Sequence, residues 1–584
     1  MNRQSLSIAL TGSGGSGVMT TGSLLLEAAA KAGWYGFMSR SAGPQIRGGE
    51  AAAVIRLASE PTESADDSFD LVLAIDPDSM TRFATEIPLR PDSLIISDAE
   101  AGRRGGCLPD VPGQVLDLPM KKLAKVIEGG RPNMIALGAI ARVIGLAEAS
   151  IYPVLEKILK SKGPDVIEAS WACVQTGFSA GAGLPVIERL TAAASSDTER
   201  WSITGNEAAG LGAIRGGIRF VAAYPITPAT ELLEWLAASL PRVGGVLVQA
   251  EDELASINQV IGASFGGTPA LTATSGPGLA LMTESIGLAV CAEVPAVILD
   301  VMRCGPSTGI ATKSEQSDLN IALNGLHGDA PHLVLAPTSI TDCVFTTQWA
   351  VHLAETLQTA VIVLSDQSLG QARAIVKRPA DISFMTRRLV PEDFEETYYR
   401  YAVGGSGGDS GGDLGVSPMS IPGQAGGQYT ADGLEHNPAG APSSMAEDHY
   451  TQLDKRERKI NKFDYAEHWA DLQGGGATAV ITWGSATGPV REALSRLRAQ
   501  GEDIRLISLR LLAPERPLEM AAALKGVKRI LVVEQSHSRQ FYRYLRAAYD
   551  LNAETRVFNR PGPLPFRPNE IIQQLAGWVG EEMT

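Results

Sequence analysis

Three segments in the middle of the chain place polar side chains in stiff turns after strand-like runs. YPITP at 224–228 holds Thr227 between two prolines, which restrict the backbone on both sides of its hydroxyl. TSGPG at 274–278 and RCGPSTG at 303–309 are Gly-Pro turns, and the second starts with Arg303. One interpretation is that the Thr227 hydroxyl and the helix N-terminus after it face an anionic ligand. The alternative is a plain helix N-cap, with the following proline in the first turn.

A cluster of carboxylates follows another strand-like run. Glu251, Asp252 and Glu253 stand at its end and precede a helix-like stretch with small residues at Gly262 and Ala263. A carboxylate at the start of a helix either complements the helix dipole or takes part in acid–base chemistry. Because loops at the carboxyl ends of parallel strands converge on one crevice, all four segments are expected to meet there.

The N-terminal glycines raise the question of a nucleotide site. Gly12, Gly14 and Gly17 fit G-x-G-x-x-G between a strand-like and a helix-like run, as in dinucleotide folds. The acidic residue that grips a ribose about 20 positions later is missing, which disfavours NAD. A glycine turn at a helix N-terminus still suits another phosphate. Arg47 could add positive charge there, or it could be structural.

The spacing of apolar runs predicts an α/β protein of three domains with largely parallel sheets. We place the first domain at 1–190, the second at 202–375 and the third at 476–584. The segment 376–475 connects the last two. Its Gly-rich start, 404–413, is expected to be loose, but the apolar residues that follow predict an ordered binding loop.

Charge and cysteine content narrow the function classes. The 584 residues carry 50 basic and 65 acidic side chains, a formal net charge of -15, which argues against nucleic acid as the main partner. The five cysteines lack metal-binding spacing, so we expect no metal or cluster held by this chain alone. Neither a signal peptide nor a membrane span is evident, and a cytoplasmic location is expected. The charged run LDKRERKINKF at 453–463 predicts a solvated helix.

The motifs taken together resemble one enzyme family. YPITP, the Glu-containing helix start, TSGPG and R-x-GPSTG, in this order, look like the alpha subunit of the 2-oxoacid:ferredoxin oxidoreductases. GSGGSGVMTTG at 12–22 with IRGGEAAAVIRL at 46–57 resembles the gamma subunit of that family, fused at the N-terminus. VVEQSH at 532–537 is similar to the transketolase C-terminal-like domain. The resemblance covers nearly the whole chain and implies a thiamine diphosphate pyrimidine-binding domain in the middle.

The resemblance assigns roles to the motif residues. A Glu bonded to the aminopyrimidine activates thiamine, and Glu253 matches best by its spacing to Gly262 and Ala263, with Glu251 as the alternative. Thr227 and Arg303 are implied to hold the 2-oxoacid carboxylate, and His436 in GLEH its distal carboxylate. Gly14, Gly15 and Arg47 are implied CoA contacts, and no residue is assigned to a metal. The implied cofactor-binding residues are Tyr224, Pro225, Ile226, Glu253, Ser275 and Gly276.

The implied reaction is CoA-dependent oxidative decarboxylation of a 2-oxoacid, with electrons passed to ferredoxin, or CO2 fixation in reverse. A beta subunit is implied to carry the diphosphate site with Mg2+ and a 4Fe-4S cluster, in a heterotetramer of two alpha and two beta chains. The fused gamma domain and the GLEH sequence favour 2-oxoglutarate, with pyruvate or another 2-oxoacid as the alternative. The rival classes are a NAD-linked dehydrogenase built on the N-terminal glycines and a non-catalytic scaffold subunit.

Overall fold

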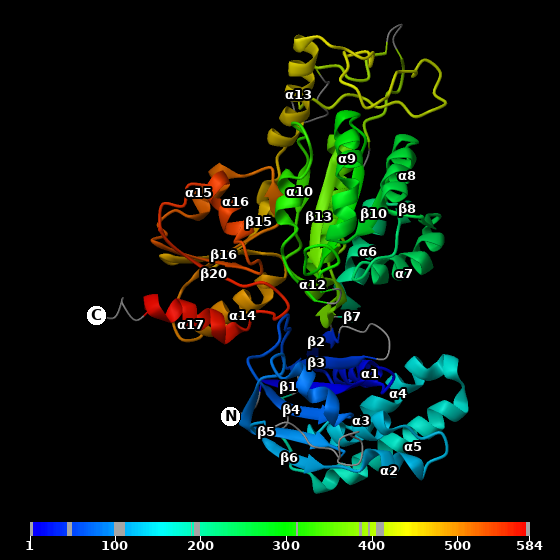
Figure 1. The fold of residues 1–584 in the computed structure, drawn as a ribbon, viewed down its shortest axis with the longest axis vertical. Coiled ribbons are helices and arrows are strands. Elements are labelled where there is room, and N and C mark those ends of the chain that lie inside the picture. Colours follow the sequence, from blue (N-terminus) through cyan, green and yellow to red (C-terminus); the bar gives the residue numbers. More distant parts are fainter. Residues whose placement is uncertain are drawn as a thin grey trace. The chain divides into compact units, whose positions relative to one another are not determined.

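A computed structural model describes residues 4–43, 49–98, 111–188, 190–191, 199–310, 313–382, 384, 388–394, 398–404 and 414–579. The chain divides into two compact units, each with its own α/β layers (Figure 1). The first comprises Met1–Thr204, Gln371–Pro379 and Phe566–Gln573, and the second comprises Gly205–Gly370, Ala380–Pro565 and Gln574–Thr584. The predicted α/β class with largely parallel sheets is confirmed.

The first unit is built on one mixed eight-stranded sheet in the order β6-β5-β4-β1-β3-β2-β14-β7. β1, β4, β5 and β6 run parallel, whereas β3, β2, β14 and β7 pair antiparallel with their neighbours. The strands are β1 (Ser5–Ser13), β2 (Tyr35–Ala42), β3 (Glu50–Ala58), β4 (Phe69–Ala74), β5 (Leu89–Ser97), β6 (Gln114–Asp117), β7 (Arg200–Thr204) and β14 (Arg373–Lys377).

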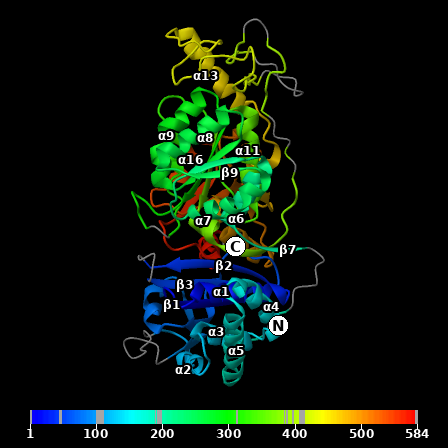
Figure 2. The ribbon, with the colours of Figure 1, turned by 90° about the vertical axis from the view of Figure 1, so that its right-hand side faces the viewer.

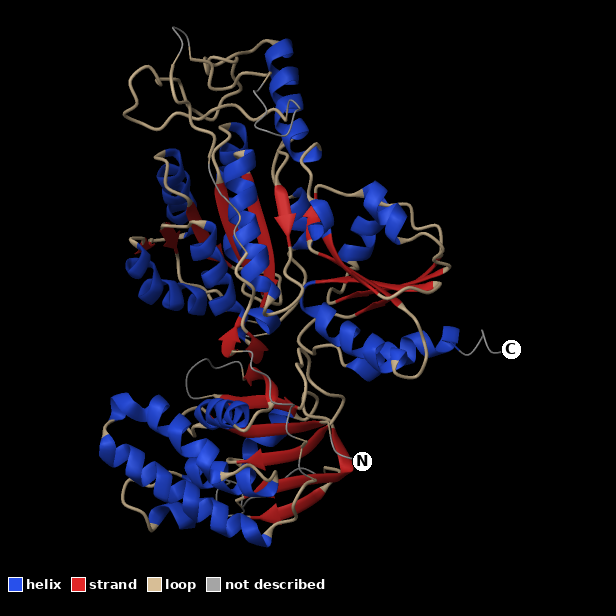
Figure 3. Cartoon of the chain, turned by 180° about the vertical axis from the view of Figure 1, so that it is seen from behind, coloured by secondary structure: helices blue, strands red, loops and turns tan. Residues whose placement is uncertain are grey.

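Alternating side chains of these strands feed two apolar layers. Ile8 and Leu10 join the main core with the helices, whereas Ala9 packs on the other face with Met80 and Phe83 of a short 3₁₀ helix. Figure 3 shows the helices gathered on one side of this sheet. They are α1 (Val18–Lys31), α2 (Met120–Lys125), α3 (Pro132–Val143), α4 (Glu148–Leu159) and α5 (Pro164–Ala180).

The boundary of the first unit differs from the predicted 1–190 domain. β7 and β14 lie on either side of the middle domain in the sequence, yet both extend the first unit's sheet. β14 supplies the ladder between β2 and β7, so these strands satisfy their backbone groups in that sheet. Sequence patterns do not reveal a strand pairing of this range.

The second unit contains a seven-stranded sheet in the order β18-β12-β13-β11-β10-β8-β9. All its strands are parallel except β18, which pairs antiparallel with β12. β11 and β13 are buried along their whole length, as expected for central strands covered on both faces. The strands are β8 (Phe220–Ala223), β9 (Val246–Gln249), β10 (Ala270–Thr274), β11 (Ala296–Met302), β12 (Leu333–Leu335), β13 (Ala360–Asp366) and β18 (Leu511–Ala513).

Helices flank this sheet in packed pairs, α6 against α11 and α8 against α9. Figure 2 shows α8 and α9 side by side. In the described part of the middle domain the helices are α6 (Gly205–Gly216), α7 (Thr230–Ser239), α8 (Glu253–Phe265), α9 (Gly276–Cys291), α10 (Leu319–Asn324), α11 (Asp342–Leu357) and the short α12 (Gln367–Gln371), which follows β13. No helix in the described ranges has the length and apolar character needed to cross a membrane.

The C-terminal region forms a five-stranded sheet in the order β15-β17-β16-β19-β20. Its neighbour in the sequence, β18, belongs instead to the seven-stranded sheet, so the predicted blocks 202–375 and 476–584 share one compact unit. The strands are β15 (Ala470–Gln473), β16 (Thr478–Trp483), β17 (Arg505–Leu509), β19 (Arg529–Glu534) and β20 (Glu554–Asn559). The helices are α14 (Thr487–Arg498), α15 (Pro517–Ala523), α16 (Gln540–Ala548) and α17 (Pro568–Val579), the last with residues in both units.

The longest described stretch of the connecting segment starts at 414 and belongs to the second unit. Met419 and His436 are buried against the second unit, which agrees with the expected ordered loop, while most of the Gly-rich start, 405–413, lies outside the described residues. The expectation of a solvated helix at 453–463 is wrong. α13 (Ala446–Asn461) buries Lys455 and Lys459 because both ammonium groups bind the carboxylate of Glu293, at 2.6 and 2.9 Å.

Candidate active site

The predicted segments of the middle domain lie at one edge of the seven-stranded sheet. β8, β9, β10 and β11 are parallel, so the residues after each strand emerge on the same side. Ala223 is in register with Gln249, and Thr274 with Asp300. The YPITP turn, the start of α8, the TSGPG turn and the Arg303 turn therefore surround one region, as the parallel-sheet argument predicts.

Thr227 and Arg303 are in direct contact. The Arg303 guanidinium donates from Nη1 to the carbonyl oxygen of Thr227 at 2.7 Å. The Thr227–Pro228 peptide is cis, and Thr227 is half-buried. The N-cap interpretation is wrong, because α7 begins at Thr230 with Ala229 at the cap position and no side chain capping it. The Thr227 hydroxyl is thus not used to start the helix.

The three carboxylates at the start of α8 have different surroundings. Asp252 is the N-cap and accepts from the Ala255 amide at 2.7 Å, so the capping function belongs to it. Glu251 is exposed, whereas Glu253 is only 8% exposed. Glu253 makes no hydrogen bond or ion pair with the described residues. A carboxylate on a largely buried side chain that has no partner in the described chain is available to accept a hydrogen bond from a ligand.

The start of α9 explains the glycines of TSGPG. A methyl group added at Gly278 would lie 2.7 Å from the Glu253 side chain, so only glycine leaves room for that carboxylate. One added at Gly276 would lie 2.5 Å from the carboxylate of Asp318. Ser275, just before the helix, is fully buried and its hydroxyl has no partner among the described residues. The turn therefore packs between two carboxylates.

Asp300 and Asp318 are site residues that the sequence analysis missed. Burial raises the pKa of Asp300 well above its ordinary value, and Asp318 raises it further. Burial, followed by the nearby Glu315, raises the pKa of Asp318 to about 7, while Arg303 opposes the shift. The only hint in the sequence is that Glu315 and Asp318 follow the Arg303 turn, and Asp300 reads as an ordinary strand residue.

Arg303 and Asp318 line a cleft in the second unit. Its volume is about 910 Å3 and its walls combine the start of α9, the Arg303 turn and the C-terminal region. Burial lowers the pKa of Arg303, and Asp318 offsets this by stabilising the guanidinium charge. The charged or titratable side chains Arg303, Glu315, Asp318 and His537 line the cleft.

The remaining predicted cofactor contacts flank this region. Tyr224 is 41% exposed, and Pro225 and Ile226 are half-buried. The exposed ring of Tyr224 offers an accessible apolar face at the same sheet edge as Glu253. The assignment of these residues to a cofactor stays a prediction.

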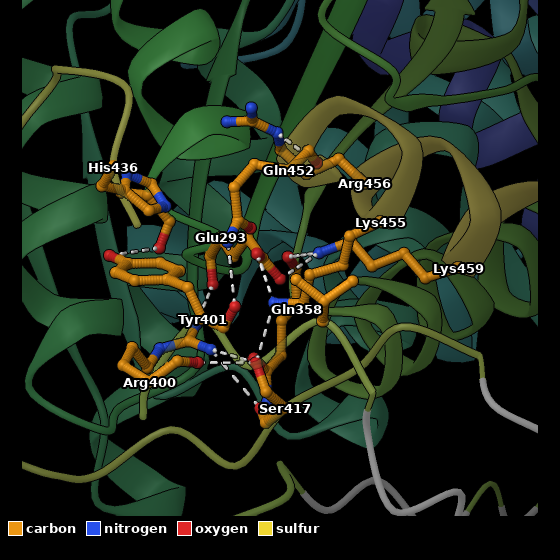
Figure 4. Close-up of polar contacts among 12 residues, drawn as sticks. Glu293, Gln358, Arg400, Tyr401, Ser417, His436, Gln452, Lys455, Arg456 and Lys459 are labelled. Carbon is orange, nitrogen blue, oxygen red and sulfur yellow. Dashed lines mark hydrogen bonds and ion pairs between the residues drawn. The ribbon is translucent and has the colours of Figure 1, made fainter. Parts of the chain in front are cut away.

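His436 is not brought to Thr227 and Arg303. It lies near the C-terminal end of α9, where the sulfur of Cys291 is 3.8 Å from the carbonyl oxygen of Leu434. Gly276 is at the other end of this 16-residue helix, about 24 Å away at 1.5 Å per residue. The His436 ring stacks on Tyr401 with centroids 3.8 Å apart, and burial lowers its pKa (Figure 4). The contact of His436 with the distal carboxylate of the substrate stays a prediction, and the position of His436 in this chain does not support it.

Cys291, Glu435 and His436 come together although the sequence separates the cysteine from the histidine. Their ligand atoms lie within 4.8 Å of one another. Arg456 already supplies a cation here, because it donates to the Glu435 carboxylate at 2.7 Å and to the Cys291 carbonyl at 3.4 Å. The other described cysteines, Cys173, Cys304 and Cys343, are buried.

The N-terminal glycine turn lies in the first unit. β1 ends at Ser13, and α1 starts at Val18 after Gly17, whose φ is 84°. The Gly14 amide donates to the carbonyl of Gly49 at 2.5 Å. Gly15 has a φ of 90° and open space around it. Arg47, the third predicted CoA contact, lies outside the described residues.

Comparison with known proteins agrees with this layout. Residues 211–455 match the family model "Pyruvate flavodoxin/ferredoxin oxidoreductase, thiamine diP-bdg", and residues 7–180 match "Pyruvate ferredoxin/flavodoxin oxidoreductase". The first match contains the YPITP, Glu253, TSGPG and Arg303 segments, and the second contains the glycine turn. The middle domain is therefore a thiamine diphosphate-binding domain.

Curated relatives and a solved structure extend the match to the whole chain. The 2-oxoglutarate synthase subunit KorA of Methanothermobacter marburgensis is 34% identical over 404 residues, covering 65% of this chain and 99% of that protein. The 2-oxoacid:ferredoxin oxidoreductase subunit alpha of Saccharolobus solfataricus is 28% identical, covering 91% of each. The 2-oxoglutarate:ferredoxin oxidoreductase structure from Magnetococcus marinus, with 2-oxoglutarate, coenzyme A and succinyl-CoA bound, is 34% identical, covers 100% of both chains and has a TM-score of 0.89. The chain belongs to the 2-oxoacid:ferredoxin oxidoreductase family.

Proposed function

We propose that the chain is the fused gamma-alpha subunit of an enzyme that converts 2-oxoglutarate to succinyl-CoA and CO2, with ferredoxin as electron acceptor, and that the reaction can run in reverse. The relatives named as 2-oxoglutarate synthase subunits and the structure with 2-oxoglutarate bound support this substrate. The observation that carries the proposal is the meeting of a buried, unpaired Glu253 with an Arg303–Thr227 pair at one sheet edge.

The residues at this edge fit thiamine diphosphate. Glu253 has a carboxylate without a partner in the described chain, and Gly278 leaves the space beside it. Glu253 would accept a hydrogen bond from the aminopyrimidine and keep its ring in the tautomer that can remove a proton. Ser275, Gly276 and the YPITP turn would border the same ring. Bound thiamine diphosphate supplies the nucleophilic and electron-holding chemistry that amino acid side chains lack.

Arg303 and Thr227 would orient the substrate. The guanidinium is held by the Thr227 carbonyl at 2.7 Å and lines the cleft with its remaining donors, which suits a carboxylate. The Thr227 hydroxyl, which caps no helix, would add a second donor. Fixing the carboxylate in this way places the 2-oxo carbon for reaction and reduces the entropy lost at the transition state.

The other components come from outside this unit. A beta subunit would supply the diphosphate site with Mg2+ and the 4Fe-4S cluster, in a heterotetramer of two alpha and two beta chains. The names of the relatives support a multi-subunit enzyme, because each is called a subunit. In the first unit, the turn at Gly14 and Gly15 would take a phosphate of CoA, since the space around Gly15 is open.

The test is an activity assay with the complete complex. The chain is co-expressed with its adjacent-gene partner, purified without oxygen, and assayed for CoA-dependent viologen reduction with 2-oxoglutarate and with pyruvate. We expect a 2-oxoglutarate rate that requires both chains and exceeds the pyruvate rate. A higher rate with pyruvate would contradict the substrate assignment, and reduction of NAD without viologen or ferredoxin would contradict the reaction.

A further inference from the structure

Polar atoms without partners are concentrated around the Arg303 turn. Within the described residues, both carboxylate oxygens of Asp300, one oxygen of Asp318, the Nε of Arg303 and the Ser275 hydroxyl are buried and make no hydrogen bond. Asp300 is fully buried and Arg303 is 7% exposed. A buried polar atom without a partner is unfavourable, and several of them together are typical of a site that a ligand completes.

Two of the residues with unpartnered atoms, Arg303 and Asp318, belong to the same cleft. Arg303 and Asp318 both line it, and Asp318 lies against the start of α9, where a methyl group on Gly276 would come within 2.5 Å of its carboxylate. Asp318 stabilises the charge of Arg303, so the two side chains interact electrostatically. Arg303 is the group to which the proposed function assigns the substrate carboxylate. Asp318 thus competes with the substrate for the same positive charge.

We propose that Asp318 is a positioning residue that controls how much of the Arg303 charge is available to an anionic substrate in the cleft. The inference rests on the proposed function and names a residue that determines affinity at the same site. A neutral Asp318 leaves the charge of Arg303 unopposed. An ionised Asp318 adds a negative charge to the same cleft, which opposes the guanidinium charge and weakens its attraction for the substrate carboxylate.

The protonation states follow from the surroundings of Asp318. Burial and Glu315 raise the pKa of Asp318 to about 7 against the opposing effect of Arg303, while burial and Asp318 raise the pKa of Asp300 well above its ordinary value. The charged or titratable groups that face this region are Asp300 from β11, Arg303 from its turn, Glu315 from the 313–318 segment and His537 after β19. Substrate carboxylates are ionised throughout this range, so they do not titrate with Asp318.

The sign of the pH dependence is therefore fixed. Below pH 7 Asp318 is neutral and the KM for the 2-oxoacid is low. Above pH 7 it ionises and the KM rises, by about tenfold, which corresponds to one pKa unit of coupling between the two charges. Asp318→Asn mimics the neutral form at every pH. We expect this variant to lose the step and to keep the low KM at pH 8.5, a change that a merely structural effect would not produce.

The test measures KM and kcat for 2-oxoglutarate between pH 6 and 9 in the holoenzyme complex. Asp318→Ala is the second variant, because it also removes the charge if the Asn variant does not assemble. His537→Gln is tested because this histidine lines the same cleft as Asp318. Asp329→Asn, an exposed carboxylate in another part of the unit, is the matched control. A step that persists in both Asp318 variants, or that disappears in His537→Gln, overturns the proposal.

A binding measurement separates this inference from the proposed function. Glutarate has two carboxylates but no 2-oxo group, so it reports on the anion site without turnover. We expect its Kd in the wild-type complex to rise about tenfold above pH 7 and to stay level in Asp318→Asn. An enzyme inactive on every 2-oxoacid that still shows this difference would contradict the proposed function alone. Normal turnover of 2-oxoglutarate with the same pH step in both proteins would contradict the inference alone.

Discussion

Acidic side chains are buried near both ends of helix α9, but only those at one end have hydrogen-bond partners. At the C-terminal end, Glu293 is fully buried and its two oxygens bind Lys455 and Lys459, at 2.6 and 2.9 Å. At the N-terminal end, Asp300 is equally buried and neither oxygen has a partner among the described residues. Figure 4 shows how closely the groups around Glu293 meet.

The difference separates a structural cluster from a functional one. Glu293 fastens the connecting segment and α13 to the middle domain, and Arg400 adds a bond to its backbone carbonyl at 2.8 Å. Such a paired network holds only one arrangement of its parts. At the other end, Arg303 and Asp318 line the cleft and each has a buried polar atom without a partner in the described chain. A ligand or water in the cleft can complete such bonds. Pairing, rather than burial, therefore identifies the candidate active site.

The largest loss of stability is expected at the C-terminal end of α9, in the cluster around Glu293. Glu293→Gln leaves two buried ammonium groups without their anion, and loss of one partner of a buried ion pair costs about 3–5 kcal/mol. Hydrogen exchange of the α13 amides should become faster, because this helix is held by the pair. Glu457→Gln removes an exposed carboxylate from the same helix and should leave exchange nearly unchanged. Equal protection of α13 in Glu293→Gln and wild type would contradict the structural assignment.

At the functional end, Arg303→Ala should affect substrate use more than folding. A hydrogen bond to a charged group contributes about 1.5–3 kcal/mol, which corresponds to a KM for 2-oxoglutarate raised roughly 10- to 100-fold. Arg303→Lys keeps the charge but lacks the planar fork, so an intermediate KM is expected. Steady-state kinetics of the complex provide the measurement. A KM within twofold of wild type for the alanine variant would remove Arg303 from the substrate site.

Acid should weaken the structural end. Burial alone would raise the pKa of Glu293, but Lys455, Lys459 and Arg400 together lower it below its ordinary value. The side chain of an unfolded Glu takes up a proton at about pH 4.3, whereas the lowered pKa keeps folded Glu293 ionised at that pH. The unfolded state therefore binds more protons below about pH 5, and stability falls as the pH falls. Calorimetric midpoints between pH 3 and 7 should drop less steeply in Glu293→Gln; parallel curves would refute this origin.

The smallest effect is expected from the matching change at the other end. Asp300→Asn also converts a buried acid to an amide, but the acid has no hydrogen bond to lose. Burial raises the pKa of Asp300 well above its ordinary value, which favours the uncharged form that the amide resembles. The midpoint should stay within about 2 °C of wild type, which corresponds to less than 1 kcal/mol. A loss as large as that of Glu293→Gln would remove the contrast between the two ends.

The sequence allowed the strand-end motifs of the middle domain to be predicted, because the carboxyl ends of parallel strands meet at one edge. Thr227 and Arg303, 76 residues apart, are indeed in contact. Asp318 and Asp300 were not predicted, since neither belongs to a turn motif; only the fold brings Asp318 to the cleft and Asp300 beside Thr274 at the sheet edge. Composition alone also misjudged α13. The charge of Lys455 predicts solvent exposure, because the sequence does not show that Glu293, 162 residues earlier, is its buried partner.

Long-range pairings account for the other differences. β7 and β14 join the sheet of the first unit, and β18 joins the sheet of the middle domain, although local patterns assign each to its neighbours in the sequence. Strands of three to five residues carry too little periodicity to specify a partner. His436 could be expected to be ordered, but its place at the C-terminal end of α9 depends on how the connecting segment folds back.

The most direct test of the central claim compares two carboxylates two residues apart. Glu253 is buried and unpaired, whereas Glu251 is exposed. The measurement is the initial rate of CoA-dependent viologen reduction at saturating 2-oxoglutarate, in complexes that carry Glu253→Gln or Glu251→Gln. We predict that the first substitution lowers kcat by about 100-fold or more, as expected for loss of acid–base catalysis, and that the second changes it less than about twofold. Full activity of Glu253→Gln, or loss of activity only in Glu251→Gln, would contradict the proposed site.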